Sequence, residues 1–405
     1  MDYLICLIII FCSGYYYSVT SKGSNITVLL LMICIVLLFL KNRNLKIKKG
    51  RLYFFIFFEC TIFISAFFSG NIGKGSIKQM LLMVCVLFIT STYSWQKFKE
   101  SYVKCMEWVS ILAIFGYIIS RTSLINFFPI VENYNGVDYF SGVFFSVIRE
   151  PYIGPIIRMH GILWEPGLLA SYEILAIIFL EKNDRLKKQY YLAFGLFIVS
   201  ILMSKSGAGL MLLPIVLLYK ILAKRDRVNL IALKTIFFGM FIGILFISTP
   251  INNIVRENEW LNRYVFSKIE NNENISNSTR RDAVLGDFMI AMDNLPFGVG
   301  IDNYSKSIEE LSNRKNINSA STSTLTSYIA KFGILGVVVA IVWLIGIYRL
   351  GSSFSKNFSR FVIMFIFFCI LSKEPHGNLL FMNCILLYSL GEFKPYLRGK
   401  NEFNK

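Results

Sequence analysis

Three side chains that could do chemistry, Arg158, His160 and Glu165, lie in one short stretch before a long apolar run. Ionisable residues at a membrane boundary are costly unless they face a wet cavity and meet partners, so they indicate a functional site. Glu165 precedes Pro166, which favours an extended Glu165 and a helix that begins at Pro166. If this helix begins inside the protein, the amides around Gly167 form an anion cradle beside Arg158.

A second basic pair, Arg280 and Arg281, falls in the expected first turn of another helix. We expect Thr279 to cap this helix and the segment 294–296 to end it. Arginine has the wrong sign for the positive end of a helix dipole, which costs roughly 0.3–1 kcal/mol and favours an anion nearby. One guanidinium group can donate two parallel hydrogen bonds to phosphate oxygens. Arg158 together with Arg280 or Arg281 could therefore clamp a diphosphate.

Each of these residues also has a structural interpretation. Arg158 can be an interfacial anchor or the partner of Glu165, which can itself cap a helix, and the pair at 280–281 can lie on a solvated helix face. His160 and His376 are the two histidines of the chain, and a lone histidine is more often structural than catalytic. The sequence alone leaves both interpretations open.

Two further carboxylates, Glu59 and Glu173, lie several residues inside apolar runs. A functional or gating role and a structural polar contact are both open for them. The cysteines all fall inside apolar runs, and no cluster of Asp, His or Cys has the spacing of metal ligands. We therefore expect neither a metal site nor a cofactor site.

The composition indicates an integral membrane protein. Of the 405 residues, 55% are hydrophobic, 16% are aromatic and only 17% are charged, which is too apolar for a soluble protein of this size. The net charge of +17 comes from basic residues in short loops between apolar runs. Membrane topology explains this pattern, so nucleic acid is not an expected partner.

Apolar windows near the ~20 residues that cross a bilayer predict an all-α membrane protein with about twelve transmembrane helices. One domain, 1–405, accounts for the whole chain, since no internal repeat or low-complexity linker divides it. The windows lie at about 3–19, 26–40, 52–69, 77–93, 103–120, 161–180, 190–204, 207–222, 232–250, 322–348, 361–372 and 378–392.

Basic residues crowd the connections at 41–51 and 220–227, which the predicted helices place on the same side of the membrane. The positive-inside rule then predicts that both termini are cytoplasmic. Two long segments, about 121–160 and about 251–320, would lie outside. We expect the second to hold short amphipathic helices on the membrane face, separated by a tight turn at 296–300.

Five short motifs occur in order along the chain. They are Arg158-x-x-Gly161-x-x-x-Glu165-Pro166, Ser204-Lys205-Ser206-Gly207, Ser278-Thr279-Arg280, Asn294-Leu295-Pro296-Phe297-Gly298-Val299-Gly300 and Ala330-Lys331-Phe332-Gly333-Ile334-Leu335-Gly336. With the predicted number of spans and the large outer loop, this ordered set resembles the O-antigen polymerase and O-antigen ligase superfamily.

The resemblance implies a metal-independent glycosyltransferase of the bacterial cytoplasmic (inner) membrane. Its donor and acceptor would be undecaprenyl-diphosphate-linked oligosaccharides, used at the periplasmic face among membrane lipids, with a polysaccharide chain-length regulator as a possible partner. Arginines matching Arg158 and Arg280 would bind the diphosphate, with Arg281 as the neighbouring alternative. Glu165 leads as the acceptor of the hydroxyl proton, followed by the two histidines and then Asp302.

The same resemblance leaves alternatives. O-antigen ligases tend to carry a histidine-asparagine pair where this chain reads Ser319-Ala320-Ser321-Thr322-Ser323, and this difference favours a repeat-unit polymerase over a ligase. A flippase for polysaccharide or lipid-linked sugar is the alternative from another class. Such a transporter should keep its charges inside the bundle and have short outer loops, whereas this chain carries a long, polar outer segment.

Overall fold

A computed structural model of the chain describes residues 3–20, 23–42, 45–132, 138–148, 158–181, 186–222, 275–315, 323–351, 357–373, 377 and 379–391. Within these residues, four helices are long and apolar enough to cross a membrane: α3 (Lys49–Phe68), α4 (Lys74–Thr92), α5 (Trp95–Ile119) and α16 (Ile334–Gly351). The predicted span at 232–250 lies outside the described residues. The structure is thus largely helical, and the predicted number of twelve spans is not reached in the described part.

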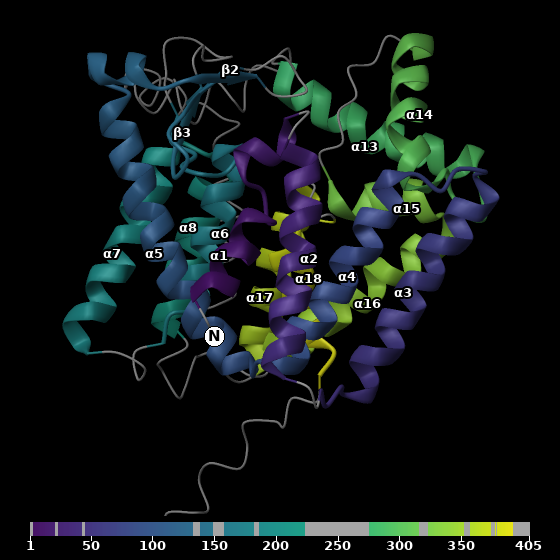
Figure 1. The fold of residues 1–405 in the computed structure, drawn as a ribbon, viewed down its shortest axis with the longest axis horizontal. Helices are drawn as coiled ribbons and strands as arrows, with labels where there is room; N and C mark the ends of the chain where they lie inside the picture. Colours follow the sequence, from purple (N-terminus) through teal and green to yellow (C-terminus); the bar gives the residue numbers. More distant parts are fainter. Residues whose placement is uncertain are drawn as a thin grey trace, which may run out of the picture.

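Four more helices occupy predicted windows. They are α2 (Gly23–Lys41), α7 (Lys187–Ser204), α8 (Gly207–Leu222) and α17 (Asn357–Lys373). The windows predicted at 190–204 and 207–222 are separate helices, because α7 ends at Ser204 and Lys205 adopts a left-handed conformation with φ of 50°. Figure 1 shows these helices gathered into one bundle with the long apolar helices.

Two short helices form the centre of this bundle. Every residue is buried in α6 (Pro166–Phe179) and in α18 (Leu380–Ser389). With 14 residues, α6 is about 21 Å long, which is shorter than the hydrocarbon core of about 30 Å. Protein rather than lipid surrounds both helices, so their ends lie inside the molecule.

The prediction of one continuous span at 3–19 is wrong. Helix α1 ends at Phe11, and a separate 3-10 turn, η1, covers Tyr16–Val19. Gly14 bends the chain between them with φ of 113°, and a Cβ at Gly14 would lie 2.3 Å from Leu168. Hydropathy did not show this break, because the break depends on close contact with another part of the chain.

The span predicted at 322–348 is also divided. Helix α15 (Thr324–Phe332) ends at Gly333, whose φ is 60°, and α16 begins at the next residue. A Cβ at Gly333 would lie 2.1 Å from the Pro296 carbonyl oxygen, which accepts a hydrogen bond from the Ile334 amide. The turn at 296–300 therefore packs into this break between α15 and the long apolar α16.

The segment predicted as an external loop at 121–160 is not all loop. It contains the 3-10 turn η2 (Ser123–Phe127) and a three-stranded antiparallel sheet in the order β1-β2-β3. The strands are β1 (Ile130–Glu132), β2 (Asp138–Ser141) and β3 (Ser146–Ile148). The all-α prediction is thus corrected here, since strands of three or four residues are too short for a clear alternating pattern.

The helices expected in the second outer segment are present as α13 (Ile275–Asp293) and α14 (Gly300–Lys315). The part of this segment before Ile275 lies outside the described residues. Helix α13 ends before the Asn294-Leu295-Pro296 motif, as predicted. Figure 1 shows α13, α14 and the sheet at the same end of the molecule, opposite the end that carries the N-terminus.

Candidate functional site

The N-terminal end of α6 has the geometry predicted from the sequence. Glu165 is extended, with φ of −144° and ψ of 141°, and Pro166 is the first helical residue. Pro166, Gly167 and Leu168 are all buried, and the Glu165 side chain does not cap the helix. The positive end of the α6 dipole therefore lies inside the protein without a side-chain cap.

The segment before α6 is held against two other parts of the chain. The Trp164 amide donates to the Gly14 carbonyl (3.0 Å), and the Tyr16 amide donates to the Ile162 carbonyl (2.9 Å). On the other side, the Ser146 amide of β3 donates to the Gly161 carbonyl (2.8 Å). The break after α1 and the small sheet therefore fix the position of the segment that carries the candidate residues.

The candidates in this segment differ in burial. His160 is fully buried, whereas Arg158 and Glu165 on either side of it are only partly buried. The predicted arginine and carboxylate thus both keep exposed surface in the segment that leads into α6. A substrate can reach both of these side chains more readily than it can reach the imidazole.

The imidazole of His160 is part of the packing of this segment. Nδ1 lies 2.6 Å from the Leu163 carbonyl oxygen and 3.3 Å from the Ser146 hydroxyl, and the ring meets Tyr139 edge to face. Burial lowers the pKa of His160 to about 4, so the ring is neutral at pH 7 and Nδ1 donates to Leu163. The buried Nε2 has no hydrogen-bond partner among the described residues. His160 is therefore a positioning residue for the segment.

The break after α1 also joins the start of α6 to the start of α18. The Leu380 amide donates to the Cys12 carbonyl (3.3 Å), and the Phe381 amide donates to the Ser13 hydroxyl (2.8 Å). From α6, the Tyr172 hydroxyl donates to the Ser13 carbonyl (2.8 Å). Two buried helices thus begin around one irregular segment, which sequence reasoning missed. The small and polar residues at 13–14, inside an otherwise apolar run, are the signal that could have shown it.

The second histidine, His376, lies outside the described residues. The next residue, Gly377, has a carbonyl that accepts hydrogen bonds from Gln79 (3.1 Å), Tyr328 (3.0 Å) and Asn383 (2.9 Å). A Cβ at Gly377 would lie 2.5 Å from the Tyr328 ring, so the absence of a side chain permits this approach. The residue that follows His376 is therefore anchored close to the start of α18.

The other end of α6 is closed by basic and acidic side chains. The Lys220 ammonium donates to the carbonyl oxygens of Ile178 (2.9 Å) and Leu180 (2.7 Å), where the helix dipole is negative. Lys99 forms an ion pair with Glu181 just after the helix. Both ends of the helix thus carry polar groups, but at this end they pair with each other and with the helix carbonyls.

The predicted start of α13 is wrong, and the argument from its dipole fails with it. The helix begins at Ile275, so Thr279 lies within it and Arg280 and Arg281 follow the first turn. Local capping rules selected Thr279 because threonine followed by an acidic residue three positions on is a capping pattern. Here the helix simply continues through that pattern.

The full length of α13 separates the two arginines by helix face. Residues seven apart are two turns apart and share a face. Arg280 shares its face with Asp287, which is buried. Arg281 shares its face with three exposed apolar residues. These are Leu285, Phe288 and Met292.

The exposed apolar face supports the predicted amphipathic character of α13.

Asp287 belongs to a polar network that joins the outer helices and that sequence reasoning missed. The Tyr304 hydroxyl of α14 and the Thr326 hydroxyl of α15 donate to its two carboxylate oxygens. The Lys331 ammonium lies over the Tyr304 ring, 4.5 Å from its centroid. Burial raises the pKa of Asp287, although the two hydrogen bonds and the Lys331 charge oppose this. The network fixes the position of α13 over α14 and α15.

Asp302, the last candidate proton acceptor, has a structural role. Its carboxylate accepts hydrogen bonds from the amides of Gly73 (2.9 Å), Gly75 (2.7 Å) and Ser76 (3.1 Å), and from the Ser76 hydroxyl. Partial burial raises the pKa of Asp302, but these hydrogen bonds outweigh it and hold the pKa below its usual value. The side chain caps the start of α4 and is a poor base.

The two carboxylates inside apolar helices differ. Glu173 is fully buried in α6 and accepts hydrogen bonds from the hydroxyls of Ser110 (2.7 Å) and Ser200. Both bonds go to Oε1 and join α5, α6 and α7, while Oε2 is buried without a hydrogen-bond partner among the described residues. Glu59 in α3 likewise has one buried oxygen without such a partner, but none of its hydrogen bonds joins it to another helix in the described part of the chain.

The described residues contain no group of three or more His, Cys, Asp and Glu side chains that could hold a metal ion. No protein-family model matches the chain, and no curated protein is similar to it at a significant level. Any assignment of function therefore rests on the ordered motifs and on the geometry of these residues.

Proposed function

We propose that this protein is a membrane glycosyltransferase that polymerises undecaprenyl-diphosphate-linked oligosaccharide repeat units at the outer face of the bacterial cytoplasmic membrane. The observation that carries the proposal is the start of α6. The helix begins at a buried Pro166 without a side-chain cap. Partly buried Glu165 directly precedes it, and partly buried Arg158 lies eight positions before Pro166 in the same segment. A helix N-terminus beside an arginine favours a phosphate group.

In this proposal the diphosphate of the donor binds at the start of α6. The amides around Gly167 and the Arg158 guanidinium stabilise the charge that develops as the diphosphate leaves. Arg280 is the second arginine of the clamp, because its position is two turns before that of buried Asp287 in α13, a helix at the same end of the molecule as the sheet (Figure 1). Arg281, on the exposed apolar face, has no part in it.

The reaction forms one bond and breaks one. A hydroxyl oxygen on the terminal sugar of the acceptor attacks the anomeric carbon of the donor glycan. The bond from that carbon to the diphosphate oxygen breaks, and undecaprenyl diphosphate leaves with its electron pair. Glu165 takes the hydroxyl proton, since it is the partly buried carboxylate next to the proposed diphosphate site.

The proposal also fixes the orientation of the chain. It places the sheet and α13 outside and both termini in the cytoplasm. Reporter fusions at Lys48 and Lys224 should read cytoplasmic, and fusions at Asn135 and Asn271 should read external. A cytoplasmic signal at Asn271 would contradict the proposed site, since the lipid-linked donor is used outside.

A reconstituted reaction tests the function itself. Purified protein in liposomes, given only lipid-diphosphate-linked repeat units and a chelator, should produce a ladder of longer lipid-linked glycans. A polymerase needs no other acceptor, whereas a ligase needs a different glycolipid. If the donor alone gives no ladder and an added core glycolipid gives a single transfer product, the protein is a ligase. Addition of a chain-length regulator should change the length distribution of the ladder without being required for it.

A further inference from the structure

A cavity of about 700 Å³ lies at the outer end of α3, away from the start of α6. Three elements form it: the end of α3, the turn between α13 and α14, and the first part of α14. Its lining residues are Phe68, Ser69, Asp293, Asn294, Leu295, Pro296, Phe297, Gly298, Val299, Asn303, Lys306, Ser307 and Glu310. The volume falls within the range of about 300–1,000 Å³ that is typical of sites for small organic ligands.

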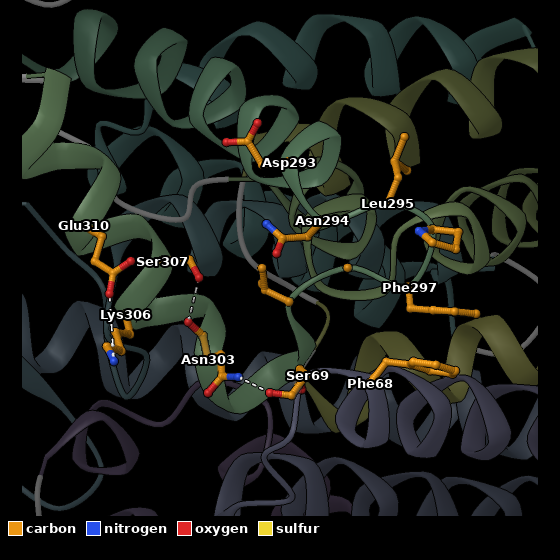
Figure 2. Close-up of a pocket in the computed structure, with 13 residues that line it drawn as sticks. Phe68, Ser69, Asp293, Asn294, Leu295, Phe297, Asn303, Lys306, Ser307 and Glu310 are labelled. Atoms are coloured by element: carbon orange, nitrogen blue, oxygen red, sulfur yellow. Dashed lines mark hydrogen bonds and ion pairs between the residues drawn. The ribbon is translucent and has the colours of Figure 1, made fainter.

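One side of the cavity is aromatic. The rings of Phe68 and Phe297 stack with their centroids 4.0 Å apart and their planes 10° apart. The two rings come from segments far apart in the sequence. Phe68 is 59% exposed, so its ring is accessible to a ligand. Figure 2 shows this pair on one side of the cavity, with Lys306 and Glu310 on the other.

Polar side chains line the remainder, and several are held in place. The Asn303 amide nitrogen donates to the Ser69 carbonyl (3.0 Å), and its oxygen accepts from Asn71 (2.8 Å). The Asn294 amide nitrogen donates to the Ile290 carbonyl (2.9 Å), and Figure 2 shows this side chain between Asp293 and Ser307. The amides therefore present donors and acceptors in fixed positions.

This combination fits a carbohydrate better than the other ligands available at a membrane surface. Sugar rings have apolar C–H faces that pack on aromatic rings and hydroxyls that bind amides and carboxylates. An acyl chain would not use the many polar groups of the lining. A diphosphate would be repelled, since Asp293 and Glu310 outnumber Lys306 among the charged lining residues.

We propose that this cavity is a glycan subsite, in which Phe68 and Phe297 support the apolar faces of sugar rings and Asn303 and Glu310 bind their hydroxyls. Its occupant is the oligosaccharide portion of the lipid-linked substrate, whose diphosphate binds elsewhere. The identification of that occupant rests on the proposed function, while binding of the glycan can be measured without catalysis.

The test uses oligosaccharide that mild acid releases from the lipid-linked fraction of the host cell, so the probe carries neither lipid nor diphosphate. Binding to the purified full chain in detergent is measured by saturation-transfer NMR and titration. Phe68→Ala should weaken binding about tenfold. Phe63→Ala is the matched control, because Phe63 lies on the same helix, is 53% exposed and does not line the cavity. It should bind as the wild type does.

A second matched pair of variants tests whether the Glu310 carboxylate contacts the glycan or acts only through its charge. Glu310→Gln should weaken binding severalfold, whereas Glu309→Gln, at an exposed neighbour outside the lining, should not. Equal binding by Phe68→Ala and Phe63→Ala, or no binding by the wild type, would overturn the subsite. If the released oligosaccharide binds at this cavity and the wild type makes no ladder, the subsite stands and the polymerase function fails. If the wild type makes a ladder and Phe68→Ala has no effect on binding of the oligosaccharide, the polymerase function stands and the subsite fails.

Discussion

Charged side chains lie at both ends of α6, but among the described residues they bind the helix backbone at only one of them. At the end near Leu180, the Lys220 ammonium binds two helix carbonyls and Lys99 pairs with Glu181. At the end that begins at Pro166, the Glu165 side chain makes no cap although it stands in the capping position. Side chains of the protein neutralise the dipole at one end, whereas the residue in the capping position makes no cap at the other.

This difference separates a structural use of charge from a functional one. Buried or partly buried charges are costly unless partners satisfy them. At the Lys220 end the partners are part of the chain, so removing them should affect stability. At the Pro166 end we propose that the partner is the substrate, so removing Arg158 or Glu165 should affect activity.

Among these substitutions, Arg158→Ala should have the largest effect on polymer formation. Loss of a guanidinium that stabilises the leaving diphosphate should lower polymer formation on the order of a hundredfold or more. Arg158→Lys should restore little, because it lacks the paired donors. Lipid-linked ladders from membranes with equal amounts of protein provide the measurement. Arg121→Ala, at an exposed arginine that bonds Tyr117, is the control and should leave the ladder intact.

Glu165→Gln should have the second largest effect on the reaction rate. The amide keeps the shape of the side chain but cannot take a proton, so the rate should fall about a hundredfold, with the Tm unchanged. Glu132→Gln, in exposed β1, should have no effect on either quantity. Activity within a few fold of the wild type would make Glu165 a structural residue and would leave the open end of α6 without a base.

Replacing the two arginines of α13 by alanine should affect the reaction rate to different extents. Arg280→Ala should lower the rate at least tenfold, because Arg280 lies on the face that carries buried Asp287. Arg281→Ala should change it less than twofold, because its face carries exposed apolar residues. Initial rates at saturating substrate distinguish them. The reverse order would show that the exposed face of α13, rather than the packed one, meets the diphosphate.

Lys220→Met should have the smallest effect on activity and act on stability instead. Loss of a cation at the negative end of α6 should cost about 1 kcal/mol and lower the Tm in detergent, while the rate per folded molecule stays the same. Lys104→Met, at an exposed position in the middle of α5, should leave the Tm unchanged. A loss of rate without a loss of Tm would mean that the closed end of α6 also takes part in the reaction.

The features that the sequence predicted depend on local chemistry. Proline explains three of them: the extended Glu165, the helix start at Pro166 and the end of α13 before Pro296. The break at 12–15 depends on contact with a segment more than a hundred residues away, and the division at Gly333 depends on contact with Pro296 and Gly298, about 35 residues away. Hydropathy windows do not contain that information.

The candidate site shows the same limit. Arg158 and Glu165 were identifiable because ionisable residues stand out beside an apolar run. Burial of His160, the capping role of Asp302 and the Asp287 network depend on tertiary contacts. The erroneous Thr279 cap came from a local pattern that the rest of α13 overrides.

Binding of a short, soluble prenyl diphosphate tests the difference between the two ends of α6 most directly. Geranyl diphosphate is titrated into the purified wild type, Arg158→Ala and Lys220→Met at one fixed ionic strength, and Kd is measured by calorimetry. The account predicts that Arg158→Ala weakens binding at least tenfold and that Lys220→Met binds as the wild type does. Equal Kd values for Arg158→Ala and the wild type would contradict a diphosphate site at the start of α6.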